Sequence, residues 1–389
     1  MANTAKLDKY KMKKLNRQLI FSLIIRNESI SRVQLAKLSD MSLMSVGRIA
    51  DDMIKLGIVA EVDGDNADPK VGRRSKFLKA STDSFLSIGL ELHRDGINIG
   101  IINLKGQTLR RIKHSLDLSS EPVQSVLETV SGLIERIIFE NRDLPVTASV
   151  GIACPGLIDD GVIRFSSQLK WRNIHIVKEL QRLTGINNIY IDNEVKARAV
   201  AEDLFGAGKQ YDSSVLLNIG SGVGSAAVVN HELYRGKLNM AGEIGHIRIS
   251  HAGNMCECGQ RGCLQTYITD RAILREARAV KDDIELGNVF VAYLTGEQWA
   301  KNLINHVLEY IATTINILAN TFAPEVIILC GSLIEDYSSF KDIILQNCKS
   351  TGSEYELSSF NLVASDFSSD ATLVGAVTLA NYKIIDQII

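Results

Sequence analysis

Three cysteines lie close together in the second half of the chain: Cys256, Cys258 and Cys263. Gly259 and Gly262 permit a tight loop in which the three thiolates converge. Six cysteines in 389 residues are too few for a disulfide framework, and in a reducing compartment this spacing favours a metal ion. Three sulfurs and an imidazole form a closed tetrahedral Zn²⁺ site, which is structural because no coordination position stays open. The alternative is a loop of three reduced thiols.

The fourth ligand of such a site has two candidates, His246 and His251, and the spacing leaves both open. The other cysteines lack neighbouring ligand residues, so we expect them to be buried apolar side chains rather than ligands. These are Cys154, Cys330 and Cys348.

A second group of candidate residues lies near the N-terminus, at the start of a predicted helix that runs from Ser42 to about Leu56. Apolar residues at helical spacing predict two helices before it, Leu15–Arg26 and Arg32–Leu38. Ser42 is a favourable N-cap, and Gly57 ends the third helix. Two short helices joined by a tight turn are the helix-turn-helix arrangement, in which the second helix enters the DNA major groove.

The outward residues of that recognition helix can hydrogen-bond base edges or phosphates. A predicted β-hairpin follows, from Ile58 to Leu78, and forms a wing with arginines placed to reach a groove. The residues predicted to contact DNA are Ser42, Met44, Ser45 and Arg48 in the helix and Arg73 and Arg74 in the wing.

The charge of the chain is distributed unevenly. Residues 1–80 carry a balance of +7, including five lysines between positions 6 and 14, whereas the remainder carries −9. Such a split is typical of a nucleic-acid-binding head on an acidic body. A merely solvated basic surface, or a packing or dimerisation module, is the alternative. The order of the helices together with the charge favours DNA binding.

The rest of the chain reads as an α/β body. Hydrophobic residues make up 46% and charged residues 23% of the chain, which excludes a disordered protein. No apolar stretch approaches the ~18–20 residues of a membrane helix, and the polar N-terminus is not a secretory signal, so we expect a cytoplasmic protein without membrane insertion. Strands alternate with helices in two units with a cleft between them. The predicted elements are a hairpin (85–92 and 96–103), helices 123–139 and 297–321, and buried strands 148–153, 215–219 and 326–329.

Several motifs of the body resemble those of the ROK family (repressor, open reading frame, kinase), and specifically its repressor branch. The resemblance covers nearly the whole chain, including Asn16-Arg17 in the head and Gly72-Arg73 in the wing. The body motifs are Gly151-Ile152-Ala153-Cys154-Pro155-Gly156, the glycine loop Gly220–Gly224, Ala241-Gly242-Glu243-Ile244-Gly245-His246, and the most specific one, Cys256-Glu257-Cys258-Gly259-Gln260-Arg261-Gly262-Cys263.

This resemblance implies an actin/hexokinase-like ATPase fold behind a winged helix-turn-helix. Residues 1–80 would form the DNA-binding domain, 81–192 a first α/β lobe completed by a C-terminal helix (373–389), and 193–372 a second lobe with the zinc loop. The family places a sugar in the cleft and makes His246 the fourth zinc ligand. The residues that match its sugar site are Asn193, Glu194, Glu243, His246 and Gln265, the last standing where the family usually has glutamate.

The kinase motifs of the family are altered in this chain. Its first phosphate turn, Asp-x-Gly-Gly-Thr, corresponds here to Glu91-Leu92-His93-Arg94-Asp95, whose bulky side chains keep backbone N–H groups from a phosphate. Its catalytic Asn-Asp-x-Asn corresponds to Asn193-Glu194-Val195-Lys196, where the longer glutamate displaces the carboxylate. We therefore expect no catalysis.

These expectations combine into a sugar-responsive transcriptional regulator, most simply a repressor of carbohydrate uptake or catabolism genes. It would bind operator DNA as a homodimer or a dimer of dimers and be released by a sugar or sugar phosphate. One alternative is an ATP-dependent sugar kinase that carries a DNA-binding head. Another is an interaction module controlled by a regulatory protein partner.

Overall fold

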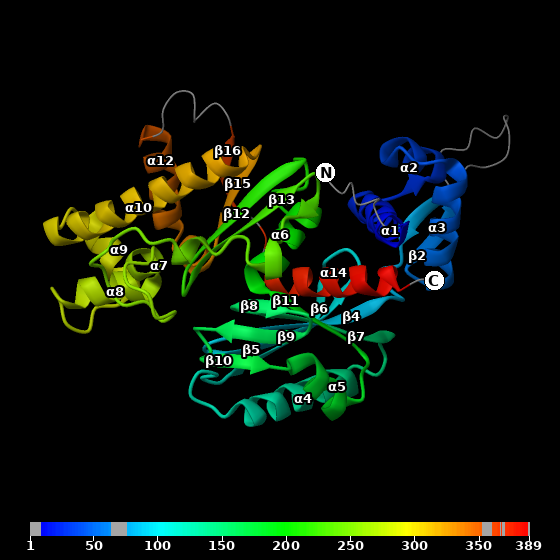
Figure 1. Cartoon of the computed structure of the whole chain (residues 1–389), viewed down its shortest axis with the longest axis horizontal. Coiled ribbons are helices and arrows are strands. Elements are labelled where there is room, and N and C mark those ends of the chain that lie inside the picture. Colours follow the sequence, from blue (N-terminus) through cyan, green and yellow to red (C-terminus); the bar gives the residue numbers. More distant parts are fainter. Residues whose placement is uncertain (1–8, 64–75, 352–359, 366, 368–369, 388–389) are drawn as a thin grey trace, which may run out of the picture. The chain divides into compact units, whose positions relative to one another are not determined.

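The computed structural model describes residues 9–63, 76–351, 360–365, 367 and 370–387 (Figure 1). Within these residues, no helix is long and apolar enough to cross a lipid bilayer. The chain divides into two compact units, each assembled from separate stretches of sequence. The first unit contains the described residues of Met1–Cys154, His175–Asp192 and Thr372–Ile389, and the second those of Pro155–Ile174 and Asn193–Ala371.

Three helices and a small antiparallel sheet form the N-terminal head, which we define as residues 9–63 and 76–80. The predicted order of helices is confirmed, although the first helix begins at Lys9 rather than Leu15, because the lysine-rich turn that precedes Leu15 has high helix propensity without an apolar signal. The helices are α1 (Lys9–Arg26), α2 (Arg32–Ser39) and α3 (Leu43–Lys55), and the sheet has the order β1 (Ile30–Ser31), β3 (Lys76–Ala80), β2 (Val59–Asp63).

Local interactions fix the two helices of the helix-turn-helix. Ser31 and Gln34 form a reciprocal capping box at the start of α2, and the Ser42 side chain accepts a hydrogen bond from the Ser45 backbone at the start of α3. Between them, Asp40 adopts a left-handed conformation (φ 53°) and its N–H donates to the Ala36 carbonyl. The turn is therefore closed by hydrogen bonds within the backbone.

The wing hairpin is also confirmed. Strands β2 and β3 pair antiparallel, with Val59 opposite Ala80 and Asp63 opposite Lys76. The tip of the wing, including the predicted DNA contacts Arg73 and Arg74, lies outside the described residues.

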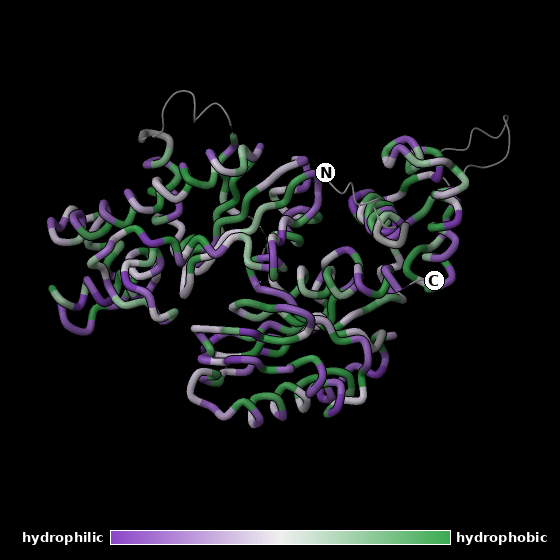
Figure 2. The backbone as a smooth tube through the Cα atoms, viewed as in Figure 1, coloured by the Kyte–Doolittle hydropathy of each residue, from purple (hydrophilic) through white to green (hydrophobic). Residues whose placement is uncertain are grey.

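A mixed five-stranded sheet forms the body of the first unit, with α4 (Val123–Glu140) and α5 (Ile176–Thr184) on one face and α14 (Ala371–Asp386) on the other (Figure 1). The predicted hairpin is confirmed, since β4 and β5 pair antiparallel. Along α4 the tube alternates between hydrophobic and hydrophilic residues, as expected for a helix with one buried face (Figure 2). The strand order is β11 (Asn188–Asn193), β7 (Val146–Cys154), β4 (Leu86–His93), β5 (Gly96–Asn103), β6 (Thr108–Ser115).

Glycine allows α14 to approach this sheet closely. A Cβ atom built on Gly151 of β7 would lie 2.1 Å from the Ala376 carbonyl oxygen, and one on Gly89 of β4 would lie 2.8 Å from the Leu373 carbonyl oxygen. Both glycines therefore face the α14 backbone, and a larger residue at either position would separate the helix from the sheet.

The second unit contains a five-stranded mixed sheet between two apolar layers. Alternate residues of β12 (Ser213–Ile219) face opposite ways. Val215 and Leu217 join the core under the long helix α10 (Gln298–Phe322), whereas Leu216 packs with Val195 and Ala199 of α6 (Glu194–Phe205). The sheet order is β14 (Glu232–Leu233), β13 (Val223–Val229), β12 (Ser213–Ile219), β15 (Val326–Cys330), β16 (Asn361–Ala364). The predicted α/β architecture is thus confirmed in both units.

Helices and several short elements complete the second unit. Its helices are α6 (Glu194–Phe205), α7 (Gln265–Ile268), α8 (Asp270–Arg278), α9 (Leu286–Leu294), α10 (Gln298–Phe322), α11 (Ser332–Glu335) and α12 (Ser338–Thr351). It also has 3₁₀ turns η1 (Lys237–Asn239) and η2 (Ile244–His246), and a small sheet of β10 (Trp171–Ile174), β9 (Val162–Ser166) and β8 (Leu157–Asp159). Cys154, Cys330 and Cys348 are all buried, as predicted.

Candidate functional site

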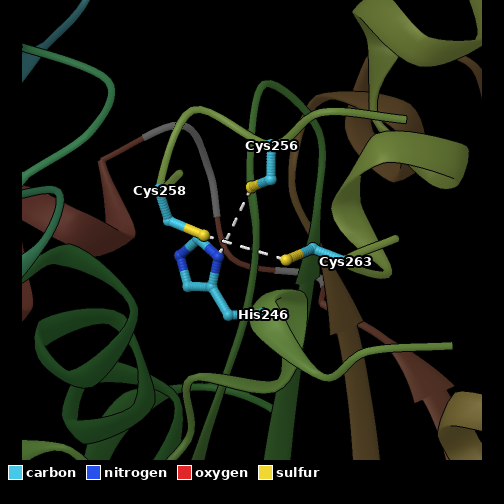
Figure 3. Close-up of side chains that lie close together, drawn as sticks. All are labelled: His246, Cys256, Cys258 and Cys263. Carbon is cyan, nitrogen blue, oxygen red and sulfur yellow. Dashed lines mark hydrogen bonds between the residues drawn. The ribbon is translucent and has the colours of Figure 1, made fainter. Parts of the chain in front are cut away.

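Four side chains converge in the second unit (Figure 3). Ligand atoms of His246, Cys256, Cys258 and Cys263 all lie within 4.8 Å of one another. The Cys256 Sγ is 3.7 Å from the His246 Nδ1, and the Sγ atoms of Cys258 and Cys263 are 3.8 Å apart. The structure therefore selects His246, whereas His251, the other candidate from the sequence, is exposed and outside the cluster.

The loop that carries the cysteines is folded by its glycines and by backbone hydrogen bonds. Gly262 has a φ of +75°, and a Cβ atom there would lie 1.7 Å from the Ser250 carbonyl oxygen. The Cys256 N–H donates to the Gln260 carbonyl, which closes the turn around Cys258. Because the glycines absorb the turn, the three thiols are brought to one side of the loop.

The dimensions of the cluster fit a tetrahedral metal ion. Sulfur ligands about 2.3 Å from a zinc-sized ion in a tetrahedron are about 3.8 Å apart, and this matches the separation of Cys258 and Cys263. Burial lowers the pKa of His246, which favours the neutral imidazole that binds a metal ion. Burial and the neighbouring thiols raise the pKa of Cys263 to about 12, which a bound cation would oppose by stabilising the thiolate. The cluster could therefore hold a metal ion.

A polar cavity, open to solvent, lies beside the cluster and entirely within the second unit. The five residues predicted for the sugar site all line it: Asn193, Glu194, Glu243, His246 and Gln265. His246 thus belongs to both the cluster and the cavity. Since its Nδ1 faces the Cys256 sulfur, its Nε2 is the atom left to face a ligand.

Asn193 positions the start of α6 as well as lining the cavity. Its Oδ1 accepts hydrogen bonds from the backbone N–H groups of Val195 (3.0 Å) and Lys196 (3.2 Å), and its Nδ2 donates to the Gly156 carbonyl (3.0 Å). This N-cap places Glu194, the first residue of the helix, at the cavity wall. The amide therefore has an architectural role that the sequence motif did not indicate.

Burial, the buried cation Lys196 and a hydrogen bond determine the state of the other two cavity residues, Glu243 and Gln265. Burial raises the pKa of Glu243, and the charge of Lys196 partly offsets that rise. Lys196 is only 1% exposed and its ammonium donates to the Asn239 carbonyl. Gln265 donates from Nε2 to the Cys256 sulfur over 3.3 Å, so its Oε1 remains as an acceptor.

Sequence reasoning missed several polar residues of the cavity. Gln168 lies in the turn between β9 and β10, with its Nε2 2.5 Å from a Cβ built on Gly222, and so it abuts the glycine loop. Ser167, Asn218 and Ser225 also line the cavity. These residues come from three separate strands and turns, and no local spacing pattern in the sequence marks them.

The predicted DNA-binding residues occupy the start of α3. Ser42 is used as the N-cap, while Met44 is 86% exposed at the surface of the head. Ser45 and Arg48 lie further along the helix and line a pocket that α3 shares with α1. The structure thus presents Met44 outward and gathers Ser45 and Arg48 against the first helix.

The head contacts the rest of the first unit through α14 and the β5–β6 turn. The buried Asp386 carboxylate pairs with Lys14 (2.8 Å) and accepts from Gln18 (2.9 Å). Tyr382, on the preceding turn of α14, packs edge-on against Phe21 of α1 with ring centroids 5.7 Å apart. Lys105 donates to the Ile25 carbonyl near the C-terminus of α1, where a positive charge is favourable. The first helix of the head is therefore anchored at both ends.

A winged helix-turn-helix followed by an α/β body with a polar cavity and a Cys/His cluster defines the class of the chain. The sequence model of the ROK family matches residues 87–383. The chain belongs to the ROK family.

Similar proteins lie in the repressor branch of this family. The chain is 26% identical over 380 residues to the xylose repressor of Bacillus subtilis, covering 97% of both chains. It is 28% identical over 338 residues to the N-acetylglucosamine repressor of Escherichia coli O157:H7, covering 83% of this chain and 82% of that protein.

Solved structures of ROK-family proteins are also similar to this chain. A ROK-family transcriptional regulator, a homologue of the Escherichia coli MLC protein, is 26% identical with a TM-score of 0.79 and covers 97% of this chain and 98% of that chain. A ROK-family glucokinase from Streptomyces griseus is 24% identical with a TM-score of 0.67 and covers 76% of this chain and 99% of that chain. The glucokinase shows that the fold of the body is shared with kinases.

Proposed function

We propose that this protein is a cytoplasmic, sugar-responsive transcriptional repressor that binds operator DNA as a dimer. The observation that carries the proposal is a cavity lined by Glu194, Glu243, His246 and Gln265 in a chain that also has a winged helix-turn-helix. Carboxylates, an imidazole nitrogen and an amide oxygen are groups that hydrogen-bond sugar hydroxyls. The resemblance to repressors named for xylose and N-acetylglucosamine supports the same conclusion. Dimeric binding follows from the symmetric half-sites that helix-turn-helix proteins read.

The charges of the cavity favour an uncharged sugar over a sugar phosphate. Two carboxylates, Glu194 and Glu243, line it. Its lining residues, all in the described part of the chain, include no lysine or arginine. A phosphate dianion would be repelled there, whereas hydroxyl groups would donate to the carboxylates.

We propose that the cluster binds one structural Zn²⁺ ion through Cys256, Cys258, Cys263 and the Nδ1 atom of His246. Three thiolates and an imidazole are the donor set of closed zinc sites. A bound ion would offset the charge of the thiolates and tie the cysteine loop to η2. Since η2 carries His246, this would fix the imidazole ring at the wall of the cavity.

Two features of the glycine loop support loss of kinase activity. The N–H of Gly220 donates to the Gly222 carbonyl within the loop, so this group is engaged before any phosphate arrives. Next to the loop, the Asp270 N–H donates to the Gly220 carbonyl, and the Asp270 carboxylate accepts from Ser332 over 2.8 Å. An acidic side chain at this turn disfavours a nucleotide. Together with the altered Asn193-Glu194-Val195-Lys196 segment, this supports binding without turnover.

A binding titration tests the function. The purified chain is titrated with the DNA upstream of its own gene at fixed salt, with and without a panel of sugars and sugar phosphates. We expect specific binding that one uncharged sugar weakens. The variant Glu243→Gln should keep DNA binding and lose the sugar response, while Glu232→Gln, an exposed carboxylate outside the cavity, should behave as wild type. Specific binding that no sugar alters, or ATP-dependent phosphorylation of a panel sugar, would contradict the proposal.

A further inference from the structure

A second polar pocket lies in the head, between α1 and α3. Lys13, Asn16 and Arg17 line it from α1, and Ser45, Arg48 and Asp52 line it from α3. Three of these six side chains are cationic and one is anionic. The pocket therefore has a net positive charge and carries hydrogen-bond donors of three chemical types: ammonium, guanidinium and neutral amide or hydroxyl.

Two of the three cations of this pocket are available to a ligand. Lys13 and Arg48 are exposed, and within the described residues neither makes an ion pair or a hydrogen bond. Asp52 offsets only one of the three positive charges of the pocket, and its own ion pair is with Lys55 outside the pocket, at 3.8 Å. Cations that line one pocket repel each other, so an anion bound there would be stabilised.

Ser45 and Arg17 supply further hydrogen-bond donors to an anion in this pocket. The Ser45 hydroxyl accepts a hydrogen bond from the Ser42 hydroxyl (3.0 Å), which leaves the Ser45 proton free to donate. Arg17, only 3% exposed, forms the inner wall and is held by a hydrogen bond from Nη1 to the Asp386 carbonyl (3.4 Å). A tetrahedral anion with several acceptor oxygens fits such a set better than a carboxylate or a base edge.

We propose that this pocket binds a backbone phosphate of the DNA duplex, with Lys13 and Arg48 as its principal ligands. The proposal rests on the DNA-binding function proposed above and changes the role of Arg48. Arg48 then fixes the position of the head on the duplex instead of reading a base, and base contacts are left to residues such as the exposed Met44 at the front of α3. Contacts from both α1 and α3 to one phosphate would set the angle at which α3 enters the groove.

The salt dependence of DNA binding tests this assignment. Affinities are measured for operator and unrelated duplexes between about 50 and 200 mM salt, for wild type, Lys13→Ala and Arg48→Ala. Each variant should bind both duplexes more weakly by a similar factor. Because a dimer carries two such pockets, the slope of log affinity against log salt should fall by about 2, so that the same rise in salt costs each variant about 12-fold less affinity than it costs wild type.

Two further variants sharpen the test. Asp52→Asn removes the carboxylate that lines the pocket and should strengthen binding to both duplexes, which a merely structural role of the pocket does not predict. Lys37→Ala removes an exposed cation of α2 that lies outside the pocket and has no ion pair among the residues that the structure describes; it should leave the slope unchanged. If the slope of log affinity against log salt fell equally in Lys37→Ala, the slope would report the charge of the whole head, and the proposal would be overturned.

Other outcomes distinguish a failure of the phosphate-site assignment from a failure of the proposed DNA-binding function. A wild-type protein that binds neither duplex contradicts the proposed DNA-binding function, and the pocket assignment falls with it. Wild-type binding with unchanged slopes in Lys13→Ala and Arg48→Ala overturns the pocket alone, as does a loss in Arg48→Ala confined to the operator. Displacement of DNA by inorganic phosphate beyond its effect on ionic strength would assign the pocket to a free anion instead.

Discussion

The contact between α1 and α14 yields a quantitative prediction for Asp386→Ala. The Asp386 side chain is 8% exposed and accepts from Lys14 at 2.8 Å and from Gln18 at 2.9 Å. A hydrogen bond to a charged group contributes about 1.5–3 kcal/mol net. Lys14 is 33% exposed, so water replaces part of its interaction when the carboxylate is removed. We therefore expect the variant to weaken docking of α1 on α14 by about 2–3 kcal/mol, less than the sum of two full interactions.

Hydrogen exchange measures this loss directly. A change of about 2–3 kcal/mol makes the undocked state about 30- to 150-fold more populated. Amide exchange around Gln18 in α1 and in the last turn of α14 should accelerate by that factor, while α4 of the same unit keeps its protection. Gln387→Ala is the matched control, because it removes a hydrogen bond to Tyr190 (2.8 Å) at the same end of α14 without touching α1.

Two results would refute the reasoning. Unchanged exchange in α1 of Asp386→Ala would show that the carboxylate does not hold the helix. An equal acceleration in Gln387→Ala would show that α14 merely frays at its end. A double-mutant cycle with Lys14→Ala apportions the energy, and we expect a coupling of about 1 kcal/mol or more between Lys14 and Asp386.

Three further predictions concern the body. Cys258→Ser should release the metal ion and lower the melting temperature. Cys348→Ala, which changes a buried thiol outside the cluster, should retain the metal ion. Elemental analysis that finds no zinc in the native protein would contradict the proposed zinc site. Burial raises the pKa of Glu243, so the folded state binds the proton of this carboxyl group more tightly than the unfolded state does. The contribution of Glu243 to the free energy of unfolding therefore falls as the pH rises above the ordinary pKa of 4.5. Glu243→Gln should therefore flatten the pH dependence of the free energy of unfolding and should raise that free energy at neutral pH. Urea titrations that show the wild-type pH profile would contradict this. Gly151→Ala places a Cβ 2.1 Å from the Ala376 carbonyl oxygen and should destabilise the protein by about 1–3 kcal/mol in the same titrations, whereas wild-type stability would show that α14 can shift at no cost.

Local signals in the sequence predicted most of the elements. The three helices of the head have apolar residues at helical spacing and serine caps, and the structure has Ser31 and Ser42 as those caps. The start of α1 was misplaced because Lys9 to Lys14 carry no apolar pattern, although lysine favours helix. The cysteine spacing predicted a cluster, yet it could not choose between His246 and His251, since that choice depends on how η2 lies against the loop.

The contacts that link the head to the body could not be predicted, because they join distant parts of the sequence. Arg17 and Asp386 are 369 positions apart, and no periodicity relates them. Their contact bears on the proposed phosphate site because Arg17 also lines the pocket between α1 and α3. The Arg17 side chain therefore touches both the proposed phosphate site and the end of α14, a helix that packs along the sheet of the first unit through Gly89 and Gly151. Asp386→Ala keeps the main-chain carbonyl that accepts from Arg17 but removes the carboxylate that binds Lys14 and Gln18, on either side of Arg17 in α1. DNA affinity should therefore respond to Asp386→Ala even though Asp386 does not line the pocket.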